Sequence, residues 1–333
     1  MTVISILLAL FVLLLIGVPV AFALGGLGVA LLILGDFAPR IAATGLLSSL
    51  DSFILIAVPL FLLMSNILLR GGVGRDLFSA VQAWVGHWPG GLAVATVISC
   101  GLFSAISGSS VATAGTIGSV AIPEMTKRGY PRPFVFGLLA AGGTLGILIP
   151  PSIILIVYGV ITESSILDLF MAGIGPGLLL MALFIGYSML YARFSSQYTA
   201  SPKADWAERR RTGLRALPTI ALAGLVITGI YAGWFTPTEA SAIGFLGALF
   251  LTFVVLRSLD MAGLKEAVMD GLRASAAILL IVGCAQVFGK AIALWRIPQA
   301  VSAFITSNLD TTGLFLIAVG IALLIMGLFM EAL

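Results

Sequence analysis

The segment that decides the fold is FSAISGSS, residues 103–110, a serine- and glycine-rich run inside an apolar stretch that extends from 92 to 123. As one helix this stretch would be about 48 Å long at 1.5 Å per residue, too long for one upright crossing of a hydrocarbon core of about 30 Å. A polar turn at its middle lets the chain enter the membrane, reverse and return. We therefore predict a re-entrant helical hairpin over 92–123.

The composition of the whole chain is that of an integral membrane protein. Of its 333 residues 60% are hydrophobic and 9% are charged, and the mean hydropathy is +1.18, whereas a typical soluble domain has about 25% charged residues. The net charge of +3 comes from basic residues in short loops, so it indicates membrane topology and not nucleic-acid binding. The N-terminus, MTVISILLAL, lacks a basic n-region and a cleavage site, so we expect a first membrane segment and no removed signal peptide.

Several further apolar stretches are candidates for membrane helices, because a crossing needs about 20 apolar residues. The full set is 3–16, 18–35, 52–69, 92–123, 134–161, 166–193, 214–234, 238–257, 272–295 and 313–333. Pro150 and Pro151 interrupt the stretch 134–161, since each ring clashes with the carbonyl four residues earlier and neither nitrogen donates. We predict two half-helices there, the second beginning at Pro151, and an all-α, polytopic bundle as the fold.

The basic residues orient the chain if the hairpin returns to the side from which it entered. That side would carry Arg70, Arg75, Lys127, Arg128, Arg132, Arg193, Lys203, Arg209, Arg210, Arg211, Arg215, Arg257, Lys265 and Arg273. The opposite side would carry only Arg40, Lys290 and Arg296. The positive-inside rule makes the first side cytoplasmic. The polar segment 195–213 is then a cytoplasmic linker, and binding of anionic lipid is an alternative role for its arginines at 209–211.

Weak internal repeats divide the chain into two related halves. Residues 25–32, GGLGVALL, resemble 244–251, GFLGALFL, and each segment follows a proline. At one constant offset, Leu68, Arg70, Phe78 and Gly101-Leu102-Phe103 match Leu294, Arg296, Phe304 and Gly327-Leu328-Phe329. Between the two starts lie five predicted crossings and one re-entrant hairpin, and this odd number of crossings predicts that the repeats are inverted. We expect a first half over 1–194 and a second over 214–333 that stops within its own hairpin.

Two places in the first half put irregular backbone at membrane depth, where every backbone group must find a partner. At the first, a helix that begins at Ser109 or Ser110 directs its N–H groups and positive end into the turn, which suits a carboxylate. The carbonyls and hydroxyls from Ser104 to Gly108 suit a dehydrated sodium ion.

The second place lies around the two prolines, which release the carbonyls of Gly146 and Ile147. The predicted sodium ligands are Ser104, Ser107, Gly108, Gly142, Gly143, Thr144 and Gly146. The predicted substrate ligands are Ser109, Ser110, Thr113, Pro150, Pro151 and Ser152. Close helix packing is the alternative role for the glycines, because small residues let membrane helices approach.

The sequence argues against an enzyme. Its single histidine, His87, lies in the loop HWPGG, and the chain has neither a serine–histidine dyad nor a Walker A motif. Cys100 and Cys284 lie inside apolar stretches without any CxxC or Cys/His pattern. We expect no disulfide framework, no zinc site and no cofactor other than sodium as a coupling ion.

Residues 103–159, from FSAISGSSVATAG to GILIPPSIILIVYG, closely resemble the first hairpin and broken helix of the large membrane subunit of TRAP (tripartite ATP-independent periplasmic) transporters. GWFTPTEASAIG, 233–244, is similar to a mid-chain motif of that subunit, and GLFMEAL, 327–333, looks like the opening of its second hairpin. The resemblance implies a sodium-coupled, elevator-type importer in the bacterial inner membrane. It also implies two protein partners, a small four-helix membrane subunit and a periplasmic substrate-binding protein, and organic-acid substrates such as C4-dicarboxylates or sialic acid. Family members continue through a second hairpin and a second Pro-Pro helix.

On this interpretation the hairpin 92–123 and the broken helix 134–161 form a domain that moves substrate and sodium against a scaffold of the other helices. A stand-alone sodium/carboxylate symporter, which needs no binding protein, is the alternative among transporters. A passive channel and a non-transporting membrane scaffold are the alternatives outside that class, and broken helices at membrane depth argue against both.

Overall fold

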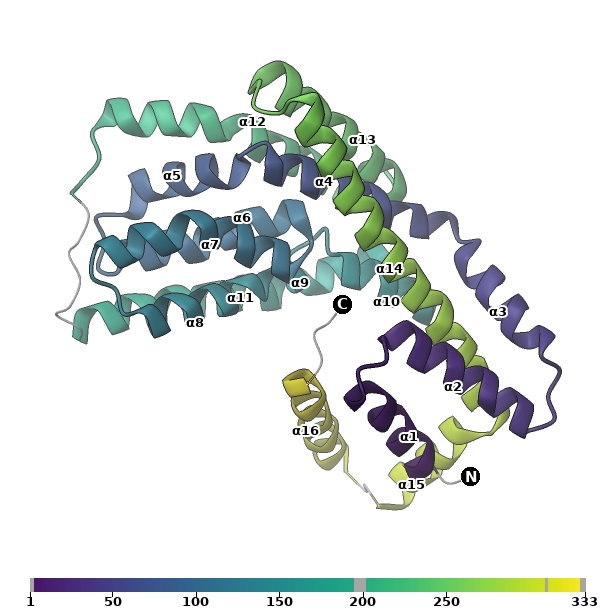
Figure 1. Ribbon diagram of the computed structural model, residues 1–333. Helices are drawn as coiled ribbons and strands as arrows, with labels where there is room; N and C mark the ends of the chain where they lie inside the picture. The colour runs from purple at the N-terminus through teal and green to yellow at the C-terminus, as the bar shows by residue number, and fades with distance from the viewer. Residues whose placement is uncertain (1–2, 195–201, 309–310, 330–333) are drawn as a thin grey trace. The chain divides into compact units, whose positions relative to one another are not determined.

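The computed structural model describes residues 3–194, 202–308 and 311–329, and within these ranges every regular element is a helix (Figure 1). The chain forms two compact units, Met1–Ser52 with Ser275–Leu333, and Phe53–Ala274. The predicted repeat halves, 1–194 and 214–333, follow internal sequence similarity and not compactness, so that division stays a prediction. The all-α class is confirmed.

The larger unit, Phe53–Ala274, is built around one deeply buried helix. Its elements are the short 3₁₀ helix η1 (Phe53–Ile56), α4 (Ala57–Arg70), α5 (Val73–Val85), α6 (Gly91–Ser107), α7 (Ser110–Lys127), α8 (Arg132–Gly143), α9 (Leu145–Leu148), α10 (Ile153–Thr162), α11 (Ile166–Phe194), α12 (Trp206–Tyr231), α13 (Pro237–Phe250), the π-helical turn η2 (Leu251–Val255) and the first part of α14 (Met261–Leu294). Helix α6 packs against α5, α7, α8 and α11, and nearly all of its residues are buried (Figure 1). The central helix is therefore one arm of the predicted hairpin.

The hairpin forms as the sequence predicts. Helix α6 ends at Ser107, Gly108 has a left-handed backbone with φ of 58°, and α7 begins at Ser110 after the extended Ser109. Among the described helices, neither arm belongs to those long and apolar enough to cross a membrane. Two short, antiparallel arms are what a hairpin that reverses within the membrane requires.

The broken helix also forms, with one correction to its boundary. Helices α8 and α9 are followed by α10 at a bend of 43°. Ile149, which precedes the first proline, is extended, as expected for a residue whose α conformation a following proline disfavours. The second half-helix begins at Ile153 and not at Pro151, because Ser152 keeps an extended backbone and occupies the N-cap position.

The long apolar helices agree with a multi-pass membrane protein. By length and composition, the described residues contain five helices able to cross a membrane, and up to six if the bent pair counts as one span. The five are Phe53–Arg70, Ile166–Phe194, Trp206–Tyr231, Pro237–Val255 and Met261–Leu294. Two predicted segments are shorter than expected. Helices α1 (Val3–Leu15) and α2 (Val20–Leu34) have 13 and 15 residues and so measure roughly 20 Å and 23 Å, less than a core of about 30 Å.

Several boundaries differ from the sequence-based expectation. Helix α12 begins at Trp206, capped by the Asp205 carboxylate, which accepts the Trp206 N–H at 2.7 Å, so the polar residues 206–213 are helical and not a loop. Helix α14 begins at Met261, well before residue 272. The short helices α3 (Arg40–Leu50), α5 and α15 (Ile297–Asn308) were missed. Residues 195–201 of the predicted linker and 330–333 of the predicted second hairpin lie outside the described residues.

The smaller unit contains α1, α2, α3, the last part of α14, α15 and α16 (Thr312–Phe329). Its core is built from Ile6, Leu31, Leu32 and Ala291. The Trp295 indole N–H donates to the Leu31 carbonyl at 2.9 Å. Glycine is required in α2, since a Cβ at Gly28 would lie 2.9 Å from the Phe288 amide nitrogen. The glycine-rich repeat motif 25–32 therefore serves close helix packing.

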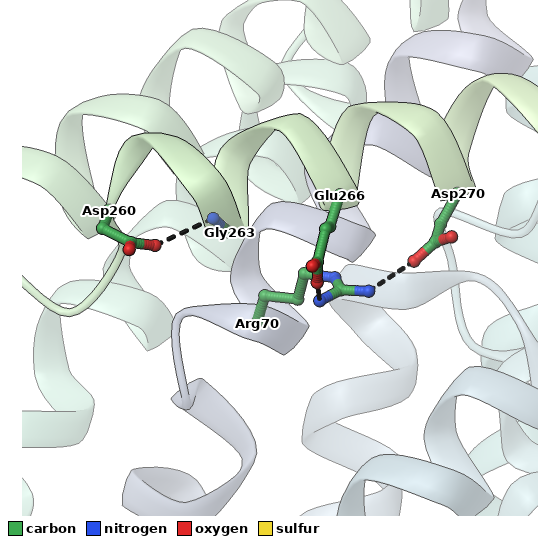
Figure 2. Close-up of polar contacts among 5 residues, drawn as sticks. All are labelled: Arg70, Asp260, Gly263, Glu266 and Asp270. Atoms are coloured by element: carbon green, nitrogen blue, oxygen red, sulfur yellow. Dashed lines mark hydrogen bonds and ion pairs between the residues drawn. The ribbon is translucent and has the colours of Figure 1, made fainter.

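An ion-pair cluster attaches the start of α14 to the end of α4 in the larger unit (Figure 2). The Arg70 guanidinium contacts the Glu266 carboxylate through Nη1, and its Nη2 lies 2.6 Å from Asp270 Oδ2. The two acids are one helical turn apart, so one planar guanidinium reaches both. In the same helix, Asp260 accepts the Gly263 N–H at 2.8 Å and caps the first turn (Figure 2).

We expect Arg70→Gln to lower the free energy of unfolding by about 1 kcal/mol, because partly exposed ion pairs contribute little individually. Thermal unfolding of the purified protein in detergent measures the effect, which should shrink at high salt. Arg273→Gln is the matched control, because Arg273 is exposed and has no ion pair among the described residues. An equal decrease in the free energy of unfolding for the two variants would show that the ion-pair cluster does not stabilise the fold.

Candidate substrate and sodium site

The two interruptions that the sequence predicts separately meet in the structure. A Cβ at Gly108, in the hairpin turn, would lie 2.6 Å from the Pro151 carbonyl oxygen and 3.2 Å from the Ile153 amide nitrogen. A Cβ at Gly146, just before the break, would lie 2.7 Å from the Ser109 carbonyl oxygen. Backbone therefore packs directly on backbone, and the hairpin turn and the proline break lie at one junction.

A cluster of three buried hydroxyls lies beside the hairpin turn. The Ser107 and Thr113 hydroxyl oxygens are 2.8 Å apart, and the Ser104 hydroxyl oxygen is 3.5 Å from that of Thr113. None of the three residues is exposed. Neutral oxygens from side chains and carbonyls are the ligands that hard cations use. Thr113, predicted as a substrate ligand, thus lies with the predicted sodium ligands Ser104 and Ser107.

The N-terminus of α7 faces the same turn. Ser109 caps it as predicted, its hydroxyl accepting the Ala112 N–H at 3.4 Å. Ser109 and Ser110 are half-buried. The first turn of a helix carries N–H groups without helical partners and a positive partial charge, so this end can hold a carboxylate.

Ser152 brings a polar group from the other interruption. Its side chain is fully buried, and within the described part of the chain its hydroxyl oxygen has no hydrogen-bond partner. The Ser152 Cα lies 3.4 Å from the position of a Cβ at Gly108. Because buried polar atoms nearly always have partners, this hydroxyl is a candidate to bind a ligand that enters the junction.

The remaining predicted ligands make packing contacts or a hydrogen bond within their own helix, and their role as ligands stays a prediction. A Cβ at Gly142 would lie 2.9 Å from the Cys100 sulfur, and one at Gly143 would lie 3.0 Å from the Ser110 carbonyl oxygen. Thr144 is exposed, and its hydroxyl donates to the Ala141 carbonyl of its own helix at 2.7 Å. Pro150 and Pro151 are buried and form the break itself. For the two glycines, the packing alternative stated from the sequence agrees with the geometry.

Interrupted helices whose breaks face each other inside a helical membrane protein are typical of secondary transporters. Residues 7–333 match the sequence profile of the family described as "Tripartite ATP-independent periplasmic transporter, DctM component". The chain therefore belongs to the family of TRAP transporter large permease proteins, which are multi-pass proteins of the bacterial inner membrane.

Three relatives illustrate the match. The C4-dicarboxylate TRAP transporter large permease protein DctM of Pseudomonas aeruginosa is 38% identical over 292 residues, 88% of this chain and 68% of the relative. The ectoine/5-hydroxyectoine large permease protein UehC of Ruegeria pomeroyi is 39% identical over 300 residues, 89% of this chain and 70% of the relative. The sialic acid large permease protein SiaM of Vibrio cholerae is 34% identical over 318 residues, 95% of this chain and 74% of the relative.

We expect Gly108→Ala to destabilise the protein, because a non-glycine residue with positive φ costs roughly 1–2 kcal/mol and its Cβ would also press on the Pro151 carbonyl. Thermal unfolding measures the loss. Gly115→Ala is the control, since this exposed glycine of α7 has no atom within 4 Å of its Cβ position. That variant should be neutral or slightly stabilising. Equal unfolding temperatures for the two variants would argue against the close contact.

Proposed function

We propose that the chain carries out sodium-coupled uptake of organic acids that a periplasmic substrate-binding protein delivers, together with a small membrane subunit. The observation that supports this most is the meeting of the hairpin turn with the Pro150-Pro151 break, which places buried hydroxyls and a helix N-terminus at one junction. The family description as tripartite supports the two further protein components. Organic acids are favoured because relatives are named for C4-dicarboxylate and for sialic acid, which both carry carboxylates.

In this proposal the sodium ion and the substrate carboxylate bind to different groups at the junction. Sodium binds at the hydroxyls of Ser104, Ser107 and Thr113 with nearby carbonyls, since these groups offer oxygen atoms without a fixed negative charge. The substrate carboxylate binds at the start of α7 and at the Ser152 hydroxyl, where the helix supplies a positive end.

Coupling follows from the short chain segment that the two sites share. The Ser107 hydroxyl lies 3.4 Å from both the amide nitrogen and the carbonyl oxygen of Ser109, the residue that caps α7. A sodium ion that fixes Ser107 therefore also fixes the turn that presents the carboxylate site. Each ligand then raises the affinity for the other by the same factor, as thermodynamic linkage requires.

Uptake into proteoliposomes containing the chain, the small subunit and the binding protein tests the function directly. We expect accumulation of a labelled organic acid only with an inward sodium gradient. Uptake that persists unchanged after sodium is replaced by potassium would refute the coupling. Uptake without the binding protein would favour the stand-alone symporter.

We expect Ser107→Ala to raise the sodium concentration for half-maximal uptake by about tenfold or more, because one polar contact to an ion contributes about 1.5–3 kcal/mol. Ser99→Ala is the matched control. Ser99 lies on the same helix, is equally buried, and has no hydrogen-bond partner for its hydroxyl within the described ranges. The control should keep the sodium dependence of the unchanged chain. Equal sodium dependence in Ser107→Ala would assign Ser107 to packing.

Ser152→Ala separates ligand binding from packing. Removing a buried hydroxyl without a protein partner should leave the unfolding temperature unchanged or raise it. If Ser152 binds the carboxylate, the same variant should need roughly tenfold more substrate for half-maximal uptake, with its sodium dependence kept. Unchanged substrate dependence would remove Ser152 from the site.

A further inference from the structure

A cavity lined by basic residues lies between α5 and the first turns of α12, away from the transport site. It has a volume of about 340 Å³. From α5 it is lined by Arg75, Asp76, Ser79, Gln82 and Ala83, and from α12 by Glu208, Arg211, Thr212 and Arg215. On each helix these positions recur every three to four residues, so two facing polar sides form the walls.

Basic side chains outnumber acidic ones in the lining of this cavity. Arg128 and Lys203 join Arg75, Arg211 and Arg215 in the lining, while Asp76 and Glu208 are its acidic residues. Among the residues that the structure describes, none of these five basic side chains forms an ion pair. Several arginines that line one cavity and form no close ion pair suit a phosphate group, because the planar guanidinium can donate two parallel hydrogen bonds to its oxygens.

The side chains around the cavity are of the kind found at a membrane surface. Trp84 and Trp206 are exposed and lie edge to face, with ring centroids 6.1 Å apart, at the end of the same helix pair. The guanidinium of Arg209 lies 5.2 Å from the Trp84 ring centroid and donates to the Ala83 carbonyl. Exposed tryptophans mark the headgroup region of a bilayer. After Arg215, α12 continues as the apolar ALPTIALAGLVITGIY, 216–231.

We propose that this cavity binds the phosphate headgroup of an anionic phospholipid. The arginines hold the phosphate oxygens, and the acyl chains lie along the apolar part of α12. Basic pockets between membrane helices on the cytoplasmic side are suited to such headgroups. The ligand is a lipid and not a soluble phosphate because the cavity adjoins both the tryptophan pair and the apolar continuation of α12.

The test uses the delipidated chain in detergent and measures binding of phosphatidylglycerol by native mass spectrometry. Phosphatidylcholine is the neutral lipid control, and inorganic phosphate and glycerol 3-phosphate are the soluble probes. We expect selective binding of phosphatidylglycerol. Arg211→Gln with Arg215→Gln should weaken it on the order of tenfold or more, since each basic residue near a lipid surface contributes a factor of about five.

The matched control is Arg210→Gln with Arg273→Gln, which removes the same charge at two exposed arginines that do not line the cavity. This control should bind phosphatidylglycerol within about twofold of the unchanged chain. Equal weakening in the two double variants would reduce the effect to general electrostatic attraction and overturn the proposal. Displacement of the lipid by either soluble phosphate at similar concentration would overturn the lipid assignment.

Discussion

The structure depends on one constraint: backbone that leaves the helical conformation inside a membrane must be covered by protein. The chain has two such interruptions in the larger unit, and each covers the other. Gly108 and Gly146 make this possible, since a side chain at either position would strike the opposing backbone. The neighbouring glycines at 142 and 143 let the supporting helices approach in the same way. The polar junction therefore exists because each interruption covers the non-helical backbone of the other.

The same constraint brings a cluster of hydroxyls and a helix N-terminus to one junction. The first arm of the hairpin ends at Ser107 and the second begins at Ser110. Between them lie only the left-handed Gly108 and the helix cap Ser109. Hydroxyls of the first arm gather on Thr113 of the second, while the cap at Ser109 orients the helix start. Movement of the turn therefore changes the surroundings of the hydroxyl cluster and of the helix start together, and the proposed coupling rests on this arrangement.

The sequence predicts local interruptions well and contacts poorly. Pro150-Pro151 and the serine-rich run alter the backbone by their own chemistry, so both breaks and the cap of α7 follow from composition. That the breaks touch depends on tertiary packing, which no local pattern encodes. Helices α3, α5 and α15 are not predicted from the sequence. Each is short and carries polar residues on one face, so none has the long apolar stretch that identifies a membrane span. The start of α12 resembles a loop in the sequence because its first turns, WAERRRTG, are mostly polar.

The number of basic residues on each side predicts the membrane topology but not the partner of each residue. The positive-inside rule treats the arginines of one membrane side alike, but the structure gives them different partners. Arg70 binds two carboxylates of α14, and Arg209 lies over Trp84. Successive residues of a helix point about 100° apart, so Arg210 and Arg211 face different surroundings although they are adjacent, and only Arg211 lines the cavity. Topology needs the charge alone, whereas the partner of each arginine is decided by the face of the helix from which it projects.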